Sequence, residues 1–145
     1  MDARQGGRGG REGDLDAGRL SIERRHVSSG SPFEPVIGFS RAIRAGDRVL
    51  VSGTGPVGAD DADAATQMRR CLEIVAAALG DLGATLDDVV RTRMYLTDAR
   101  EWEAVARVHG EAFGRARPAA TMVVVAGLLD VRWSVEMEAE ALVRS

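Results

Sequence analysis

The sequence is poor in the residues that build covalent and metal centres. Its 145 residues include one cysteine, Cys71, and two histidines, His26 and His109. A lone cysteine excludes an internal disulfide framework, and beside a predicted helix stripe we interpret Cys71 as a packing residue rather than a nucleophile. One histidine lies in a segment with few apolar residues and the other on a helix stripe, which favours neither a metal site nor a nucleophilic triad. We expect no metal and no cofactor.

The sequence also lacks long apolar runs and an excess of positive charge. No run approaches the roughly 18 to 20 residues that span a bilayer, and the Gly- and Arg-rich N-terminus lacks the apolar core of a secretory signal. We therefore expect a cytoplasmic protein without a membrane partner. The formal net charge of −3 argues against a nucleic-acid partner, because such binding depends on clustered basic residues.

The composition, 45% hydrophobic and 28% charged, is typical of a soluble globular protein, and the length predicts one domain. Residues 1–20 combine glycines and charges with almost nothing apolar to bury. We predict that this segment is a disordered tail, with an over-long start-site assignment as the alternative. The folded domain is predicted to span residues 21–145, with order beginning within 21–31.

Short apolar runs and helical stripes alternate along the rest of the chain. The predicted elements are a β-hairpin over 39–43 and 48–52, a helix over 61–79, a strand over 89–96, a helix that Asp98 caps and Gly114 ends, and strands that begin near Ala119 and cover 135–142. This order predicts a two-layer α+β domain with two helices on one face of a mostly antiparallel sheet.

The other sheet face is expected to carry charged residues in a regular pattern. Period-two alternation puts three glutamates of the last strand on one face, and Arg91, Arg93 and Tyr95 on one face of the strand 89–96. We predict that Met122 and Val124 lie between these rows. Such a face is usually solvated, but the alternative is contact with partner subunits.

Four segments carry a resemblance to a known family. Arg117-Pro118-Ala119-Ala120-Thr121-Met122-Val123-Val124-Val125-Ala126, followed by Val135-Glu136-Met137-Glu138-Ala139, resembles the closing signature of the RidA (YjgF/YER057c/UK114) family. Gly46 to Gly53 resembles the family's entry strand and Asp87 to Asp98 its central strand. The match runs in order from about Ser31 to the C-terminus.

The resemblance implies a chorismate-mutase-like (YjgF/RidA-like) fold and a homotrimer. In that assembly the sheets pack around a central axis, the helices lie outside, and a small-molecule cleft lies at each subunit interface. Some RidA-like proteins have been described as ribonucleases or translation inhibitors, which the acidic charge balance does not support here.

The resemblance also implies residue roles. In the enamine/imine deaminases an arginine after Pro-Ala grips the substrate carboxylate, and the first glutamate of the last strand handles the water that attacks the C=N carbon. The matching catalytic residue here is Glu136. The predicted substrate-binding residues are Phe39 at the cleft mouth, Gly53 in its lining, Arg93, and the pair Ala120 and Met122.

Ala120 stands where the deaminases carry the arginine. A charge-assisted hydrogen bond contributes about 1.5 to 3 kcal/mol, so losing a bidentate pair weakens carboxylate handling at least tens-fold. Arg93 or Arg117 could replace it, or Arg93 could only balance the glutamates in ion pairs. Two functions stay open: a RidA-like hydrolase of imines or enamines, and a non-catalytic trimer that binds a metabolite or a protein. Pericyclic chemistry rests on fold analogy alone.

Overall fold

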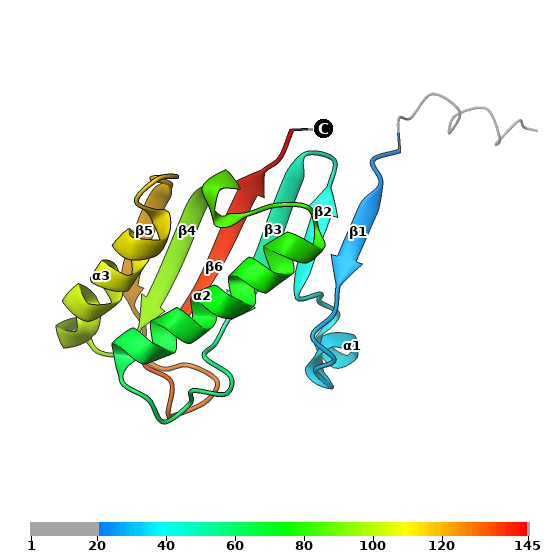
Figure 1. The fold of residues 1–145 in the computed structure, drawn as a ribbon. Helices are drawn as coiled ribbons and strands as arrows, with labels where there is room; N and C mark the ends of the chain where they lie inside the picture. The colour runs from blue at the N-terminus through cyan, green and yellow to red at the C-terminus, as the bar shows by residue number, and fades with distance from the viewer. Residues whose placement is uncertain (1–20, 145) are drawn as a thin grey trace, which may run out of the picture.

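A six-stranded sheet with the strand order β1-β2-β3-β6-β4-β5 organises the computed structural model, which describes residues 21–144 (Figure 1). Strands β4 and β5 pair in parallel, and all other neighbours pair antiparallel. The strands are β1 (Arg24–Val27), β2 (Ala42–Ala45), β3 (Arg48–Thr54), β4 (Val89–Leu96), β5 (Ala119–Val124) and β6 (Val135–Leu142). The predicted α+β class with a mixed, mostly antiparallel sheet is confirmed.

Two long helices, α2 (Ala64–Asp81) and α3 (Trp102–Phe113), cover one face of this sheet (Figure 1). Asp63 caps α2 by accepting a hydrogen bond of 2.8 Å from the Thr66 amide. A capping box of Thr85 and Asp88 forms over a short 3-10 turn before β4. These local signals explain why the expected element order holds from residue 39 onward.

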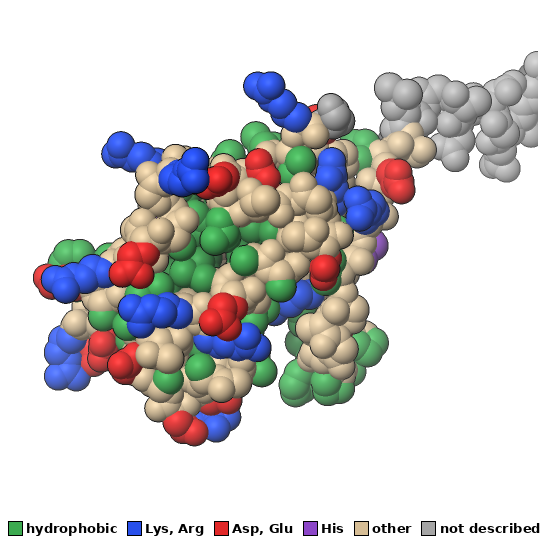
Figure 2. Space-filling model, viewed as in Figure 1, with side chains coloured by type: hydrophobic (Ala, Val, Ile, Leu, Met, Phe, Trp, Pro, Cys, Tyr) green, Lys and Arg blue, Asp and Glu red, His purple; other side chains and the backbone are tan. Residues whose placement is uncertain are grey.

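The sequence did not predict two short N-terminal elements, β1 and the helix α1 (Phe33–Ile37). Both are too short to show a periodic pattern. Three large side chains of α1, Phe33, Val36 and Ile37, are exposed. Figure 2 shows hydrophobic side chains gathered at the corner of the molecule where α1 lies. The predicted tail over residues 1–20 lies outside the described residues.

The core lies between the sheet and the two long helices. Val49, Met137 and Val75, from two strands and α2, are fully buried in it. Two residues differ from what their polarity would suggest. The polar Gln67 of α2 is fully buried, because its side chain bonds backbone groups of Asp60, Ala62, Arg132 and Ser134. Trp102, the aromatic first residue of α3, is 54% exposed.

The predicted position of Met122 and Val124 on the open sheet face was also wrong. The register pairs Arg93 with Thr121 and Met94 with Met122. Residues paired across neighbouring strands point to the same side, so Ala120, Met122 and Val124 point to the helix-covered side. Alternation shows which residues share a face, whereas pairing with β4 decides which face that is.

The start of β4 departs from alternation as well. The register between β4 and β6 shifts between Val89 and Arg91. Strict alternation from Arg91 would expose Val89 and bury Val90, but Val89 is buried and Val90 is 43% exposed. A bulge adds one residue to a strand and exchanges the faces of the residues beyond it. Within residues 21–144, no helix has both the length and the apolar character needed to cross a membrane.

Candidate functional site

Three glutamates line β6 on the sheet face that the helices leave open. Their neighbours Val135, Met137, Ala139 and Ala141 are buried on the other side, and Glu136, Glu138 and Glu140 are each half-buried. The alternation therefore places three acidic groups in a row on one face, as predicted. They differ in what surrounds them.

Glu138 and Glu140 each have charged or polar partners, and Arg48 Nη2 lies 3.9 Å from Glu140 Oε2. Arg93 Nη1 lies 3.9 Å from a carboxylate oxygen of Glu138 and 3.8 Å from one of Glu140. The Tyr95 hydroxyl donates to Glu138, and this bond is the main cause of a raised pKa of Tyr95. The geometry matches the interpretation in which Arg93 balances the glutamates. Its predicted role in substrate binding stays a prediction.

Glu136 has a different environment, although it lies two residues from Glu138. Its carboxylate makes no hydrogen bond and no ion pair with any residue of the described part of the chain. Burial raises the pKa of Glu136 above the ordinary value of 4.5, and nearby Arg41 opposes part of that rise. A half-buried carboxylate with a raised pKa is suited to accept a proton.

Gly53 lies directly against this carboxylate. A Cβ atom at Gly53 would lie 2.7 Å from Glu136 Oε1, closer than real side chains approach. The register of β3 against β6 shifts between Val51 and Thr54, which opens the ladder at this point. The absence of a side chain at Gly53 allows Glu136 to pack on the backbone of β3, so two of the predicted residues lie together.

Arg41 completes the cluster, and the sequence analysis missed it. Its Nη2 donates to the carbonyl oxygens of Ser52, at 2.7 Å, and Gly53, at 2.5 Å. Its Nε is enclosed and has no acceptor among residues 21–144. Burial lowers the pKa of Arg41, and the charge of Glu136 partly offsets this effect. In the sequence, the one sign that Arg41 belongs to a site is that it is a charged residue within the predicted hairpin strand 39–43.

The remaining predicted residues lie elsewhere in the chain. Phe39 is half-buried and precedes Arg41 by two residues. Ala120 and Met122 lie on β5, three strand spacings from β3 and two from β6, or roughly 14 and 10 Å at the usual spacing, and they point to the opposite side of the sheet from Glu136. One chain therefore brings Gly53 and Glu136 together but keeps Ala120 and Met122 away from them.

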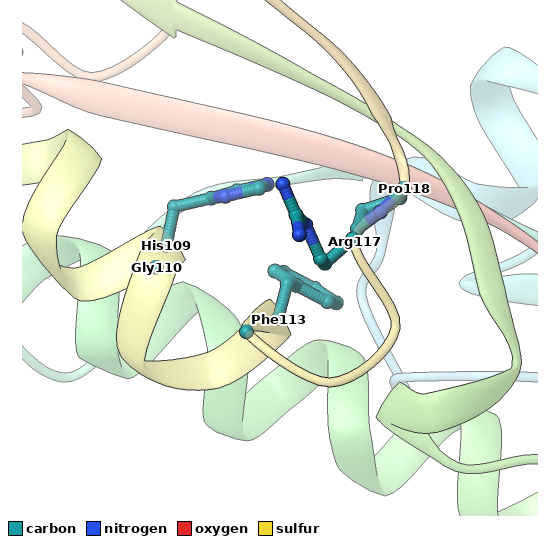
Figure 3. A pocket seen from close by; sticks show the side chains of 6 residues that line it. His109, Gly110, Phe113, Arg117 and Pro118 are labelled. Atoms are coloured by element: carbon teal, nitrogen blue, oxygen red, sulfur yellow. The ribbon is translucent and has the colours of Figure 1, made fainter.

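A separate hollow of about 450 Å³ lies at the end of α3 (Figure 3). Its lining includes His109, Phe113, Arg117 and Pro118. His109 Nε2 lies 2.8 Å from Thr92 Oγ1, and burial lowers the pKa of His109. In Figure 3 the Arg117 side chain extends toward His109. Its backbone φ of 48° is the one positive value of a non-glycine residue among those described.

The fold and the open-face glutamate row define a two-layer protein of the RidA type, and comparisons with known proteins agree. The model of the family described as Endoribonuclease L-PSP matches residues 30–143. The chain belongs to this family, so the RidA (YjgF/YER057c/UK114) resemblance is confirmed. Membership supports a protein that binds small molecules.

Individual relatives give the same result. An uncharacterised protein of Streptomyces coelicolor is 40% identical over 121 residues, which cover 81% of this chain and 90% of that protein. A RutC family protein of Pyrococcus abyssi is 34% identical over 74% of this chain and 88% of its own length. The crystal structure of Rv2704 from Mycobacterium tuberculosis, a member of the YjgF/YER057c/UK114 family, superposes with a TM-score of 0.79. It is 49% identical and covers 83% of this chain and all of its own.

Proposed function

We propose that the protein is a RidA-like homotrimer that binds a small imine or enamine in a cleft between copies and hydrolyses it through Glu136. The observation that carries this proposal is the state of the three glutamates. Arg93 and Tyr95 occupy Glu138 and Glu140, whereas Glu136 is half-buried and free of partners within residues 21–144. Leaving one acid unpaired beside two paired ones is typical of a group that acts on a ligand.

The chemistry requires one proton acceptor and one water molecule. Glu136 takes a proton from water as the water oxygen bonds to the C=N carbon, and it returns this proton to the nitrogen, which has received the π electrons of the C=N bond. The new hydroxyl then gives its proton to the same nitrogen through Glu136, the O–H electron pair forms the C=O bond, and the C–N bond breaks with its electron pair leaving on nitrogen. The products are ammonia and a carbonyl compound. Because burial raises the pKa of Glu136, its carboxylate is a better base for this step.

The distance between β3 and β5 supports an interface cleft. Glu136 and Gly53 form one wall, and the other predicted binding residues, Ala120 and Met122, lie on the far edge strand. A second copy has to supply that strand if both walls contact one ligand. Val123 and Val124 on β5 are 42% and 56% exposed, which favours burial of this edge against a partner chain.

The substrate is expected to differ from that of the archetypal deaminases. Ala120 carries no charge at the position where they have an arginine, so activity on 2-aminoacrylate-type imino acids is proposed to be weak or absent. Although the family's description names an endoribonuclease, the net charge of −3 gives phosphate binding no support. We therefore do not propose RNA cleavage.

The direct test is ammonia release from a panel of small imines by the wild type, Glu136→Gln and Glu140→Gln. Glutamine keeps the shape of the side chain and removes the base, so Glu136→Gln should lose about 100-fold or more of the activity. Glu140→Gln should stay within about threefold, because this control lies on the same strand face with its charge already paired. If a folded Glu136→Gln protein releases ammonia at the same rate as the wild type, Glu136 is not the base, and the non-catalytic binding trimer is favoured.

A further inference from the structure

The polar side chains of β4 lean along β6 in one direction, away from Glu136. The register places Tyr95 opposite Glu136 and Arg93 opposite Glu138. The Tyr95 hydroxyl donates to Glu138, one position further along the row of glutamates, and not to Glu136. Arg93 likewise reaches past Glu138 to Glu140. The two partners that β4 supplies therefore serve the other glutamates, and within residues 21–144 neither bonds to Glu136.

The direction of the Tyr95 bond decides what its oxygen can still do. A phenol has one O–H group to donate, and Tyr95 gives it to the Glu138 carboxylate. This bond raises the pKa of Tyr95, so the phenol keeps its proton at neutral pH. The Tyr95 oxygen is left with lone pairs alone and acts as an acceptor. Glu136, when ionised, is an acceptor as well.

One water molecule fits between these two acceptors. Residues directly opposite on antiparallel strands have Cβ atoms about 4.5 to 5.5 Å apart, so Tyr95 and Glu136 stand side by side on the open face. The residue to which the Tyr95 hydroxyl leans is two positions, or roughly 7 Å, from Glu136 along β6. Two hydrogen bonds of about 2.8 Å through one water cover a span of this order. Two acceptors cannot bond each other, but water has a donor for each.

We propose that Tyr95 orients the attacking water: the water donates one O–H to Glu136 and the other to the Tyr95 oxygen, and its lone pair points to the C=N carbon. This inference rests on the proposed function and adds a residue to it. The proton shared with Glu136 is the one that moves in the hydrolytic step, while the bond to Tyr95 stays a hydrogen bond. Glu138 and Arg93 act one contact further away, because they fix the direction of the Tyr95 hydroxyl.

Tyr95→Phe tests this role, because it removes the oxygen and keeps the ring. Ammonia release by the full chain from the best substrate of the imine panel should lose about fivefold in kcat, with KM within about twofold, since the water and not the substrate loses a contact. Arg48→Gln is the matched control. It alters the partner of Glu140 at the far end of the row and should leave both constants within about twofold.

A second measurement does not depend on turnover. In Glu138→Ala the Tyr95 hydroxyl loses its acceptor and is free to donate to Glu136, which should lower the pKa of Glu136 in a ¹³C NMR titration of labelled glutamate side chains. Loss of the Glu138 charge lowers the same pKa, whereas Arg41, the other charged group that acts on Glu136, is unchanged.

The double variant Tyr95→Phe with Glu138→Ala separates the two causes. Its fall in the pKa of Glu136, relative to Tyr95→Phe alone, contains only the loss of charge. The fall from wild type to Glu138→Ala should be larger than this by at least about 0.5. If Glu138→Ala does not fold, the kcat of Tyr95→Phe decides.

Three results would overturn the proposal: a folded Tyr95→Phe protein with the wild-type kcat while Glu136→Gln loses activity, a raised KM at unchanged kcat, and an equal fall in the pKa of Glu136 with and without the Tyr95 hydroxyl. Each of them leaves the proposed function intact, because Glu136 still acts as the base. A wild type that releases no ammonia from any imine of the panel would overturn the proposed function and this inference together.

Discussion

Two arginines on the same sheet face, Arg93 and Arg41, have opposite surroundings. Arg93 lies on β4 between two glutamates and is 38% exposed, with ion-pair distances of 3.8 and 3.9 Å. Arg41 donates to two backbone carbonyls, and within residues 21–144 its enclosed Nε–H has no acceptor and its guanidinium forms no ion pair with the neighbouring Glu136. The charge of Arg93 is paired within the protein. Arg41 and Glu136 keep unused hydrogen-bond donors and acceptors that a ligand would occupy.

The difference shows that the number of charges on a face says little about where a ligand binds. Half-exposed pairs such as that of Arg93 contribute little to stability, and they also leave little capacity for a ligand. The sequence pattern places Glu136 in a row with Glu138 and Glu140. Glu136 differs from them only in its contacts, which the structure shows and the sequence does not.

After the loss expected in Glu136→Gln, the next largest effect is expected from placing an arginine on β5. Ala120→Arg should raise ammonia release from 2-aminoacrylate-type imino acids by about tenfold, which corresponds to about 1.4 kcal/mol. It would supply a carboxylate clamp from the opposite wall of the cleft. A coupled assay of 2-imino acid hydrolysis on both proteins provides the measurement.

The matching control is the double variant Ala120→Arg with Glu136→Gln, which should be as inactive as Glu136→Gln alone. A folded Ala120→Arg trimer without any gain would show that the edge strand does not approach Glu136. Strong wild-type turnover would show instead that the cleft needs no arginine at this position.

A smaller effect is expected on stability. Because burial raises the pKa of Glu136, its charged form is less favourable in the folded than in the unfolded state, and this group's contribution to stability falls as pH rises from about 4.5 through the raised pKa. At pH 7 Glu136→Gln should therefore unfold at the same temperature as wild type or slightly above it, by up to roughly 3 °C once solvent screening of this half-exposed group is considered.

Thermal unfolding followed by circular dichroism at pH 4 and pH 7 measures this effect. The higher unfolding temperature of the glutamine variant should be present at pH 7. The difference should shrink at pH 4, where the Glu136 carboxylate of the wild type becomes protonated and, like glutamine, neutral. A variant that is clearly less stable than wild type at pH 7 would indicate that Glu136 has a structural partner.

Much of the fold followed from local signals in the sequence. The strands 89–96 and 135–142 have the predicted bounds, and the glutamates lie on one face as alternation required. What could not be predicted depends on pairing between distant segments. The face of Ala120 depends on its register with β4, and the contact of Gly53 with Glu136 depends on an irregular step in β3.

The site was predictable to a similar degree. The family resemblance pointed to Glu136 and Gly53, which the fold brings together. Arg41 could not be found in this way, because its importance comes from two backbone carbonyls and a carboxylate that reach it from other strands. A charge on a hairpin strand gives no indication of such partners.

A crystal structure of the protein with pyruvamide, a neutral relative of the carbonyl products, tests the central claim most directly. The account predicts a trimer with pyruvamide at each interface, its keto carbon facing Glu136 and a water molecule within about 3 Å of that carboxylate. Pyruvamide bound at Arg93, or in the hollow between His109 and Arg117 while the surroundings of Glu136 stay empty, would contradict it.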